Sequence, residues 1–257
     1  MIPLLEPIFQ GAWAALGEAL HHSPEAPVGS VRVIELLAPA RLDAALQRHA
    51  RHLGVTGRDL RASASSWSLG YLSTLLSPVA AAASVLQHRF PVGAEQMAVE
   101  LDEAGMALRF HISTAGVPAP GSSTAQRYDT LLWRHLAPLF AAISRQTKLP
   151  PKVLWGNAAR QLGSVLDQAL RLVGNAEHLV KDRDTLLDQP IWPDGRINPM
   201  HARQPVAIAL NAYHAPPADL HRQCCLCYLL PGQDYCQACP LVPRRARAAP
   251  VSSAWPR

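Results

Sequence analysis

All five cysteines of the chain lie within sixteen consecutive positions near its end, and none occurs in the first 223 residues. They are Cys224, Cys225, Cys227, Cys236 and Cys239. Thiols gathered in one short segment cannot link distant parts of a fold, which is how disulfides stabilise proteins. Clustered thiols instead bind a metal or carry out redox chemistry. The sequence therefore predicts a fold with a thiolate site in its C-terminal segment.

The spacing of the cysteines narrows the kind of site. Cys236 and Cys239 form a C-x-x-C turn, in which two thiolates converge on one metal. Cys224 and Cys225 are adjacent, and a Pro-Gly pair at residues 231–232 predicts a chain reversal that brings the two halves together. Structural zinc sites prefer a C-x2–4-C pair in both halves, whereas a dinuclear iron–sulfur cluster offers two irons as targets. The spacing favours iron–sulfur and leaves zinc as the alternative.

A longer run around these cysteines resembles a known family. The run CCLCYLLPGQDYCQACPL at residues 224–241 is similar to the C-terminal signature of the FhuF-type ferric-siderophore reductases, which carry C-C-x10-C-x-x-C. Weaker similarities to the same family are W-x3-Y-L-x5-P at residues 67–78 and LWGNAA at residues 154–159. The resemblance therefore extends over much of the chain.

This resemblance implies a cofactor and its ligands. The family holds a [2Fe-2S] cluster with four cysteines, and the matching positions here are Cys224, Cys225, Cys236 and Cys239. Cys227 departs from the family pattern, because many relatives have another residue there. We expect it to be a spare thiol that packs as a small apolar residue, with a role as an alternative ligand left open.

The activity that the resemblance implies is one-electron reduction of siderophore-bound Fe(III) to Fe(II) in the cytoplasm, which releases iron from the chelate. The substrate is then a ferric siderophore, and the electron donor stays unidentified. No catalytic residue beyond the cluster is expected. Two other functions remain open, namely a four-cysteine zinc protein with a structural or interaction role and an iron–sulfur electron carrier for a protein partner.

Other polar residues flank the cysteines. His221 lies three residues before Cys224, so a mixed histidine and cysteine site is an alternative, although four cysteines are already available. Cations beside a cluster stabilise its more negative reduced form and attract anionic siderophores. The candidates for this role are Arg222, Arg244, Arg245 and Arg247. A solvated basic tail explains the same arginines equally well.

The charge distribution gives no support for a nucleic-acid partner. The net charge is +5, of which residues 221–257 carry +4, from five arginines against one aspartate. This basic tail lacks the interleaved aromatic residues of nucleic-acid sites, so no nucleic-acid partner is expected, while peripheral membrane contact stays possible.

The sequence contains no Walker loop, G-x-G-x-x-G, G-x-S-x-G or H-E-x-x-H motif. Nucleotide binding and serine hydrolysis therefore have no support.

No export signal or membrane span is expected. The first ten residues contain Glu6 and neither lysine nor arginine, unlike the start of a signal peptide. Residues 62–87 carry no formal charge, but eight serine or threonine hydroxyls and Pro78 interrupt them. A lipid-spanning helix prefers leucine, isoleucine and phenylalanine. We therefore expect two buried helices that meet at Pro78, and a cytoplasmic protein without a transmembrane segment.

The remaining pattern predicts a helix-dominated α+β fold with a small antiparallel hairpin or sheet and a C-terminal cysteine-rich cluster-binding segment. At 49% apolar and 17% charged residues, the chain has the composition of a globular protein. Apolar residues at helical spacing predict helices over residues 39–53, 129–145 and 158–180, the second bent at Pro138. Alternation predicts a hairpin over residues 99–110 and a strand over residues 31–36.

Three parts of the chain follow from these expectations. Residues 1–120 form a mixed α/β part, residues 121–220 a helical part, and residues 221–257 the iron–sulfur segment, which we expect to dock on the helices as one compact unit. The Pro-, Gly- and Ser-rich stretch at residues 117–124 separates the first two parts. Residues 189–217 are expected to be irregular around one short buried element. Asn157 is expected to cap the last long helix while Trp155 packs nearby, with a position of both beside the cluster or substrate as the alternative.

Overall fold

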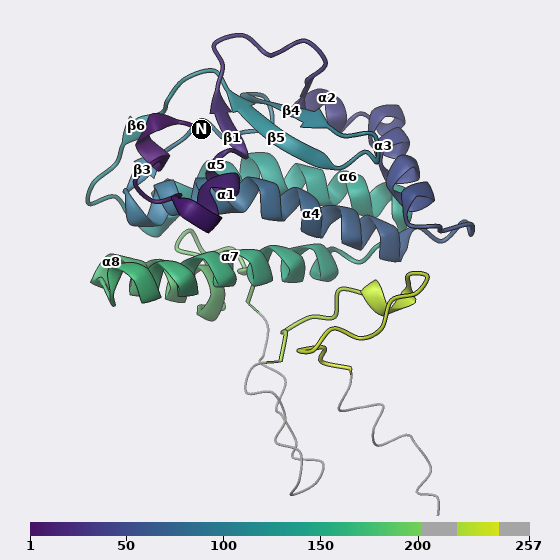
Figure 1. The fold of residues 1–257 in the computed structure, drawn as a ribbon. Helices are drawn as coiled ribbons and strands as arrows, with labels where there is room; N and C mark the ends of the chain where they lie inside the picture. The colour runs from purple at the N-terminus through teal and green to yellow at the C-terminus, as the bar shows by residue number, and fades with distance from the viewer. Residues whose placement is uncertain (202–219, 242–257) are drawn as a thin grey trace, which may run out of the picture.

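Helix α4 (Arg61–Ala80) lies at the centre of the molecule in a computed structural model that describes residues 1–201 and 220–241. Fourteen of its twenty residues are buried, as expected of a helix that is apolar on every side. Figure 1 shows that the main sheet covers one side of α4 and that helix α7 (Pro151–Val173) covers the other. The result is a helix-dominated α+β fold, which confirms the predicted class.

The prediction that two helices meet at Pro78 is wrong. Helix α4 passes through Pro78, ends at Ala80 and runs directly into the π-helix η3 (Ala81–Val85). A proline in a helix interior removes one backbone hydrogen bond and costs about 3 kcal/mol. The burial of α4 between two layers outweighs this cost, because each large apolar side chain that leaves water contributes about 1.5–3 kcal/mol.

Residues Arg61–Val85 are long and apolar enough to cross a membrane by length and composition alone. In this fold 72% of their most apolar window is buried inside the protein. The core position of α4 accounts for its apolar character without a bilayer.

The main sheet is mixed rather than purely antiparallel. Its strand order is β1-β5-β4-β2, with β1 parallel to β5 and the other neighbours antiparallel, and β3 pairs separately with β6. The hairpin predicted over residues 99–110 is confirmed as β4 and β5. The described strands are β1 (Leu20–His22), β2 (Val31–Arg32), β3 (His88–Arg89), β4 (Met97–Leu101), β5 (Ala107–Ile112) and β6 (Val117–Pro118).

The hairpin is fixed to α4 through its turn. Gly105 has a φ of +79°, and a Cβ there would lie 2.6 Å from the carbonyl oxygen of Ala45. The carbonyl of Gly105 accepts a hydrogen bond of 2.7 Å from the Trp67 indole, which is fully buried on α4. The turn therefore needs glycine for both its conformation and its close contact.

The strand predicted over residues 31–36 is correct only at its start. The chain leaves β2 after Arg32 and forms the short helix α2 (Val33–Leu36), which buries Val33 and Leu36. Apolar residues in so short a run fit both the spacing of a helix and the alternation of a strand, so the pattern could not distinguish the two. The helix predicted next is confirmed as α3 (Pro39–His52).

The helix predicted over residues 129–145 is confirmed within a longer helical run. The run consists of α5 (Thr124–Leu131), the π-helix η4 (Leu132–Leu136) and α6 (Ala137–Thr147). Ser123 begins it with a capping box to Gln126. Pro138, where a bend is predicted, lies in the first turn of α6, and the π-helix η4 ends two residues before it.

The helix predicted over residues 158–180 is wrong at both ends. Helix α7 begins at Pro151, a residue favoured in the first helical turn, and ends before Gly174, which has a φ of +83°. A separate helix α8 (Glu177–Arg183) and the π-helix η5 (Asp184–Asp188) follow. Apolar residues continue at helical spacing beyond Gly174, so the sequence pattern did not indicate that the helix ends there.

Shorter elements complete the described chain. They are η1 (Pro3–Leu5), η2 (Gly11–Trp13), α1 (Ala14–Gly17) and η6 (Cys227–Leu229). One buried apolar cluster extends from Ile2 to Met200. Of the stretch predicted to be irregular, residues 189–201 contain an isolated bridge between Ile191 and Ile197. The short buried element expected at residues 205–210 lies outside the described residues.

Candidate metal centre

Residues 220–241, called the cysteine segment below, pack against α4 and α7 (Figure 1, the yellow end of the described chain). The 3-10 helix η6 contacts α4, and Leu226 packs against the buried apolar cluster. The segment contains little helix or strand of its own, so its neighbours supply most of its apolar contact. This is the docking on the helices that the sequence predicts.

A glycine of α7 makes the close approach possible. A Cβ at Gly156 would lie 2.5 Å from the Cβ of Gln223, the residue before the adjacent cysteines. Glycine in a helix interior costs about 1 kcal/mol relative to alanine. The contact with the cysteine segment explains why it is nevertheless present here.

The expectation that Asn157 caps a helix is wrong, because Asn157 lies within α7. Its side-chain amide is buried and donates hydrogen bonds to the Ser65 carbonyl, the Ser65 hydroxyl and the Ser68 hydroxyl, at 3.3, 3.0 and 2.9 Å. These contacts join α7 to α4 directly beside Gly156. Gly156 of this motif lies against Gln223 of the cysteine segment, while a position of Trp155 and Asn157 beside the cluster or substrate stays a prediction.

The structure brings the four predicted ligands close to one another. The Cys224 thiol interacts with those of Cys239 and Cys225, and the Cys236 thiol with those of Cys225 and Cys239. The chain reverses between the two halves, and Gly232 in the predicted Pro-Gly turn has a φ of +69°. The His221 amide closes the segment with a 2.8 Å hydrogen bond to the Ala238 carbonyl.

Burial differs among the thiols. Cys224, Cys225 and Cys239 are buried, while Cys236 and Cys227 are partly exposed. Among residues 1–201 and 220–241, no group of three or more His, Cys, Asp or Glu side chains converges on a single metal position.

The electrostatic environment gives the thiols different pKa values. A hydrogen bond from the Cys227 thiol lowers the pKa of Cys225 to about 4, and Arg160 adds to this effect. Burial raises the pKa of Cys224 to about 11 and also raises that of Cys236. Because the thiolate is the form that binds metal, Cys225 is the cysteine best prepared to do so.

Arg160 is a residue of this site that the sequence analysis missed. It lies four residues after Gly156, so both are on the same face of α7. Its positive charge acts on Cys225, Cys227, Cys236 and His221. The signal that was available is the glycine and arginine at helical spacing in the stretch LWGNAAR at residues 154–160.

The predicted flanking arginines have a different role where they are described. Arg222 donates to the Leu187 carbonyl and forms an ion pair with Asp188, so it fastens the cysteine segment to η5. Its charge is compensated by that carboxylate. Arg244, Arg245 and Arg247 lie outside the described residues. His221 is half-buried, and burial together with Arg160 lowers its pKa.

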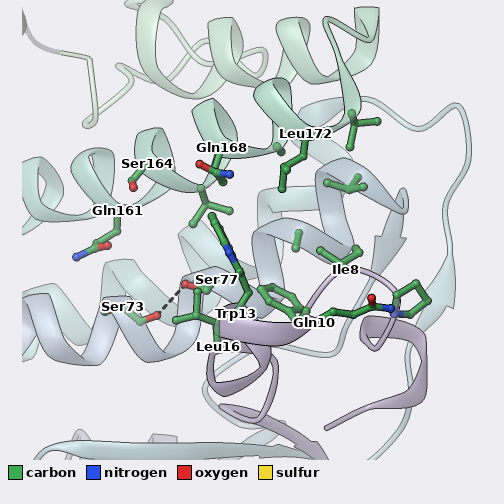
Figure 2. Close-up of a pocket in the computed structure, with 17 residues that line it drawn as sticks. Ile8, Gln10, Trp13, Leu16, Ser73, Ser77, Gln161, Ser164, Gln168 and Leu172 are labelled. Carbon is green, nitrogen blue, oxygen red and sulfur yellow. Dashed lines mark hydrogen bonds between the residues drawn. The ribbon is translucent and has the colours of Figure 1, made fainter.

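A separate cavity of about 590 Å³ lies between the N-terminal segment, α4, η3 and the C-terminal part of α7. Figure 2 shows Trp13, Leu16, Gln161 and Gln168 among the side chains around it. None of the described residues that line it carries an ionisable side chain. It therefore offers no cation to an anionic chelate and stays unassigned.

Comparisons with known proteins indicate the family of this chain. The family model described as "Ferric iron reductase FhuF-like transporter" matches residues 65–206, which end before the cysteine segment. A protein of Escherichia coli (strain K12) named ferric siderophore reductase is 22% identical over 221 residues, which are 84% of this chain and 81% of that protein.

Solved structures show a related fold. Aerobactin synthetase IucA from Klebsiella pneumoniae is similar with a TM-score of 0.54 and 15% identity, both with ATP bound and in a second structure. The match covers 68% and 67% of this chain but only 37% and 38% of the synthetase chains. At this identity the similarity concerns the fold alone. Because the family match covers more than half of its 257 residues, the chain belongs to the FhuF-like ferric iron reductase family.

Proposed function

We propose that this protein reduces siderophore-bound Fe(III) to Fe(II) with a [2Fe-2S] cluster held by Cys224, Cys225, Cys236 and Cys239. Membership of the ferric iron reductase family and the name of the Escherichia coli relative support the reductase role. The observation that carries the cluster assignment is that the thiols of these four cysteines interact with one another within the cysteine segment. The adjacent Cys224 and Cys225 depart from the C-x2–4-C spacing of structural zinc sites, whereas a dinuclear cluster offers two irons as targets.

The residues around the thiols also fit an anionic group. Gly156 leaves room for the cysteine segment, and Arg160 places a positive charge beside Cys225 and Cys236. When bound, a [2Fe-2S] cluster supplies single electrons. The buried thiols Cys224, Cys225 and Cys239 keep water from most of the site, while the partly exposed Cys236 marks the side that a chelate can approach.

The chemistry of the substrate explains how reduction releases iron. Siderophores hold Fe(III) with hard oxygen donors, and Fe(II) binds such donors more weakly because it is softer and less charged. One electron converts Fe(III) to Fe(II), and a one-electron donor of unknown identity supplies it. We place the reaction in the cytoplasm, because reducing compartments keep clustered thiols free to bind metal.

A single-turnover experiment tests this proposal. The protein is purified without oxygen, reduced with dithionite, freed of excess reductant and mixed with a ferric trihydroxamate siderophore and an Fe(II)-specific chelator. The expected result is one Fe(II) trapped per reduced cluster. A coloured protein that releases no Fe(II) would favour the electron carrier, and a colourless zinc-containing protein would favour the structural alternative.

A further inference from the structure

Arg160 is a partly exposed residue of α7 whose guanidinium is buried in part and has incomplete hydrogen bonds. Its Nε and Nη2 atoms are shielded from solvent and have no hydrogen-bond partner among the described residues. Burying a charged or polar group without a partner is unfavourable. An anion beside Arg160 would remove this penalty.

The groups on which this charge acts belong to the cysteine segment. Arg160 lies one helical turn after Gly156, and a Cβ at Gly156 would meet Gln223 of that segment. The charge of Arg160 acts on the Cys225, Cys227 and Cys236 thiols.

The other described cation beside the segment is compensated. Arg222 pairs with Asp188 and donates to the Leu187 carbonyl. The neighbouring His221 is half-buried, and burial favours its neutral form. Among the described residues of this site, Arg160 is thus the cation that is left for an anionic ligand.

We propose that Arg160 is a positioning residue that raises the reduction potential of the cluster through the Cys225 and Cys236 thiolates. The inference rests on the proposed function, because it requires the cluster. A two-iron cluster on four thiolates has a formal charge of about −2 when oxidised and −3 when reduced. A fixed cation stabilises the more negative form, and hydrogen bonds to cluster sulfurs raise the potential as well.

An anaerobic redox titration with dithionite tests this inference. Dithionite supplies one electron to each cluster, and no covalent bond forms or breaks. The variants are Arg160→Gln, which removes the charge, Arg160→Lys, which keeps it, and the control Arg171→Gln, which removes an exposed arginine from the same helix. Iron content and the visible spectrum of each variant establish that the cluster is intact.

We expect Arg160→Gln to lower the ratio of reduced to oxidised cluster at a fixed potential by about tenfold, equivalent to about 59 mV for one electron. Arg160→Lys should reverse most of this decrease, and Arg171→Gln should change the ratio by less than half as much on a logarithmic scale. Resonance Raman spectra should show a shift of the iron–cysteine stretching bands in both Arg160 variants, because the planar guanidinium fork is lost in each.

The outcomes separate this inference from the function on which it rests. An intact cluster with unchanged potential in Arg160→Gln would overturn the inference alone, as would an equal shift in Arg171→Gln. If Arg160→Gln does not retain the cluster, Arg160→Lys decides through its Raman bands, and unchanged bands overturn the inference. A wild-type protein without any cluster would overturn the proposed function and the inference with it.

Discussion

Gly156 lies directly beneath Gln223, and a Cβ at position 156 would come within 2.5 Å of the Gln223 Cβ. The near end of the Gln223 side chain cannot rotate away, so any larger residue at position 156 must displace the cysteine segment. The first prediction concerns Gly156→Ala. Alanine favours the helix by about 1 kcal/mol, yet we expect about tenfold weaker retention of the cluster, as for other changes next to metal ligands.

Iron per chain after anaerobic gel filtration measures this effect. Gly163→Ala on the same helix is a matched control. A Cβ at Gly163 would meet only the Leu187 Cδ1 atom, at 3.4 Å. We expect the control to keep its iron. Equal iron content in both variants would contradict the close packing described here.

The second prediction separates the ligands from the fifth cysteine. Cys236→Ser should abolish or distort the visible spectrum of the cluster, whereas Cys227→Ser should leave it nearly unchanged. The Cys227 thiol is a hydrogen-bond partner of Cys225, so its loss removes one contact to a ligand but no ligand. Absorption and iron content of the two variants check the assignment, and equal losses would overturn it.

The third prediction concerns Asn157, which joins α7 to α4 through Ser65 and Ser68. Asn157→Ala leaves buried oxygen atoms without their donor, so we expect the free energy of unfolding to fall by about 1–3 kcal/mol. Urea denaturation measures the change. Gln161→Ala on the same helix serves as the control and should change stability by less than about 0.5 kcal/mol.

The fourth prediction concerns pH and the buried His135. Its Nδ1 donates to the Val92 carbonyl at 2.8 Å, and its Nε2 accepts from the Tyr71 hydroxyl at 2.7 Å, so the ring is neutral. Burial lowers its pKa from 6.5 to about 4. The unfolded chain therefore takes up a proton at higher pH than the folded protein does.

Stability from His135 is complete above pH 6.5 and is lost progressively as the pH falls toward 4. This shift corresponds to about 2 kcal/mol lost between about pH 7.5 and about pH 5. Urea unfolding at the two pH values should show the loss in the wild type and a loss smaller by about that amount in His135→Gln. The same pH dependence in both proteins would be inconsistent with a neutral buried histidine.

The cysteine site was accessible from the sequence because its chemistry is local. Cys224 and Cys225 lie within sixteen residues of Cys236 and Cys239, and the turn between them contains Pro231 and Gly232. Arg160 was not accessible in this way, because it meets the thiols only when α7 packs against the cysteine segment. Its distance in sequence from Cys225 is 65 residues.

Some helix and strand ends could likewise be predicted from the sequence, and others could not. The spacing of apolar residues predicted α3 and the β4–β5 hairpin, where this spacing and the turn residues indicate the same structure. It failed at Pro78, where tertiary burial overrides a local helix breaker, and at Gly174, where apolar spacing continues across a break. In both places the outcome depends on contacts with distant segments rather than on the local residues.

The central claim is that the four cysteines hold a two-iron cluster, and metal analysis of protein purified without oxygen tests it most directly. We predict about two iron and two acid-labile sulfide per chain, with visible absorption that bleaches when dithionite is added. One zinc per chain, with neither sulfide nor colour, would contradict this claim.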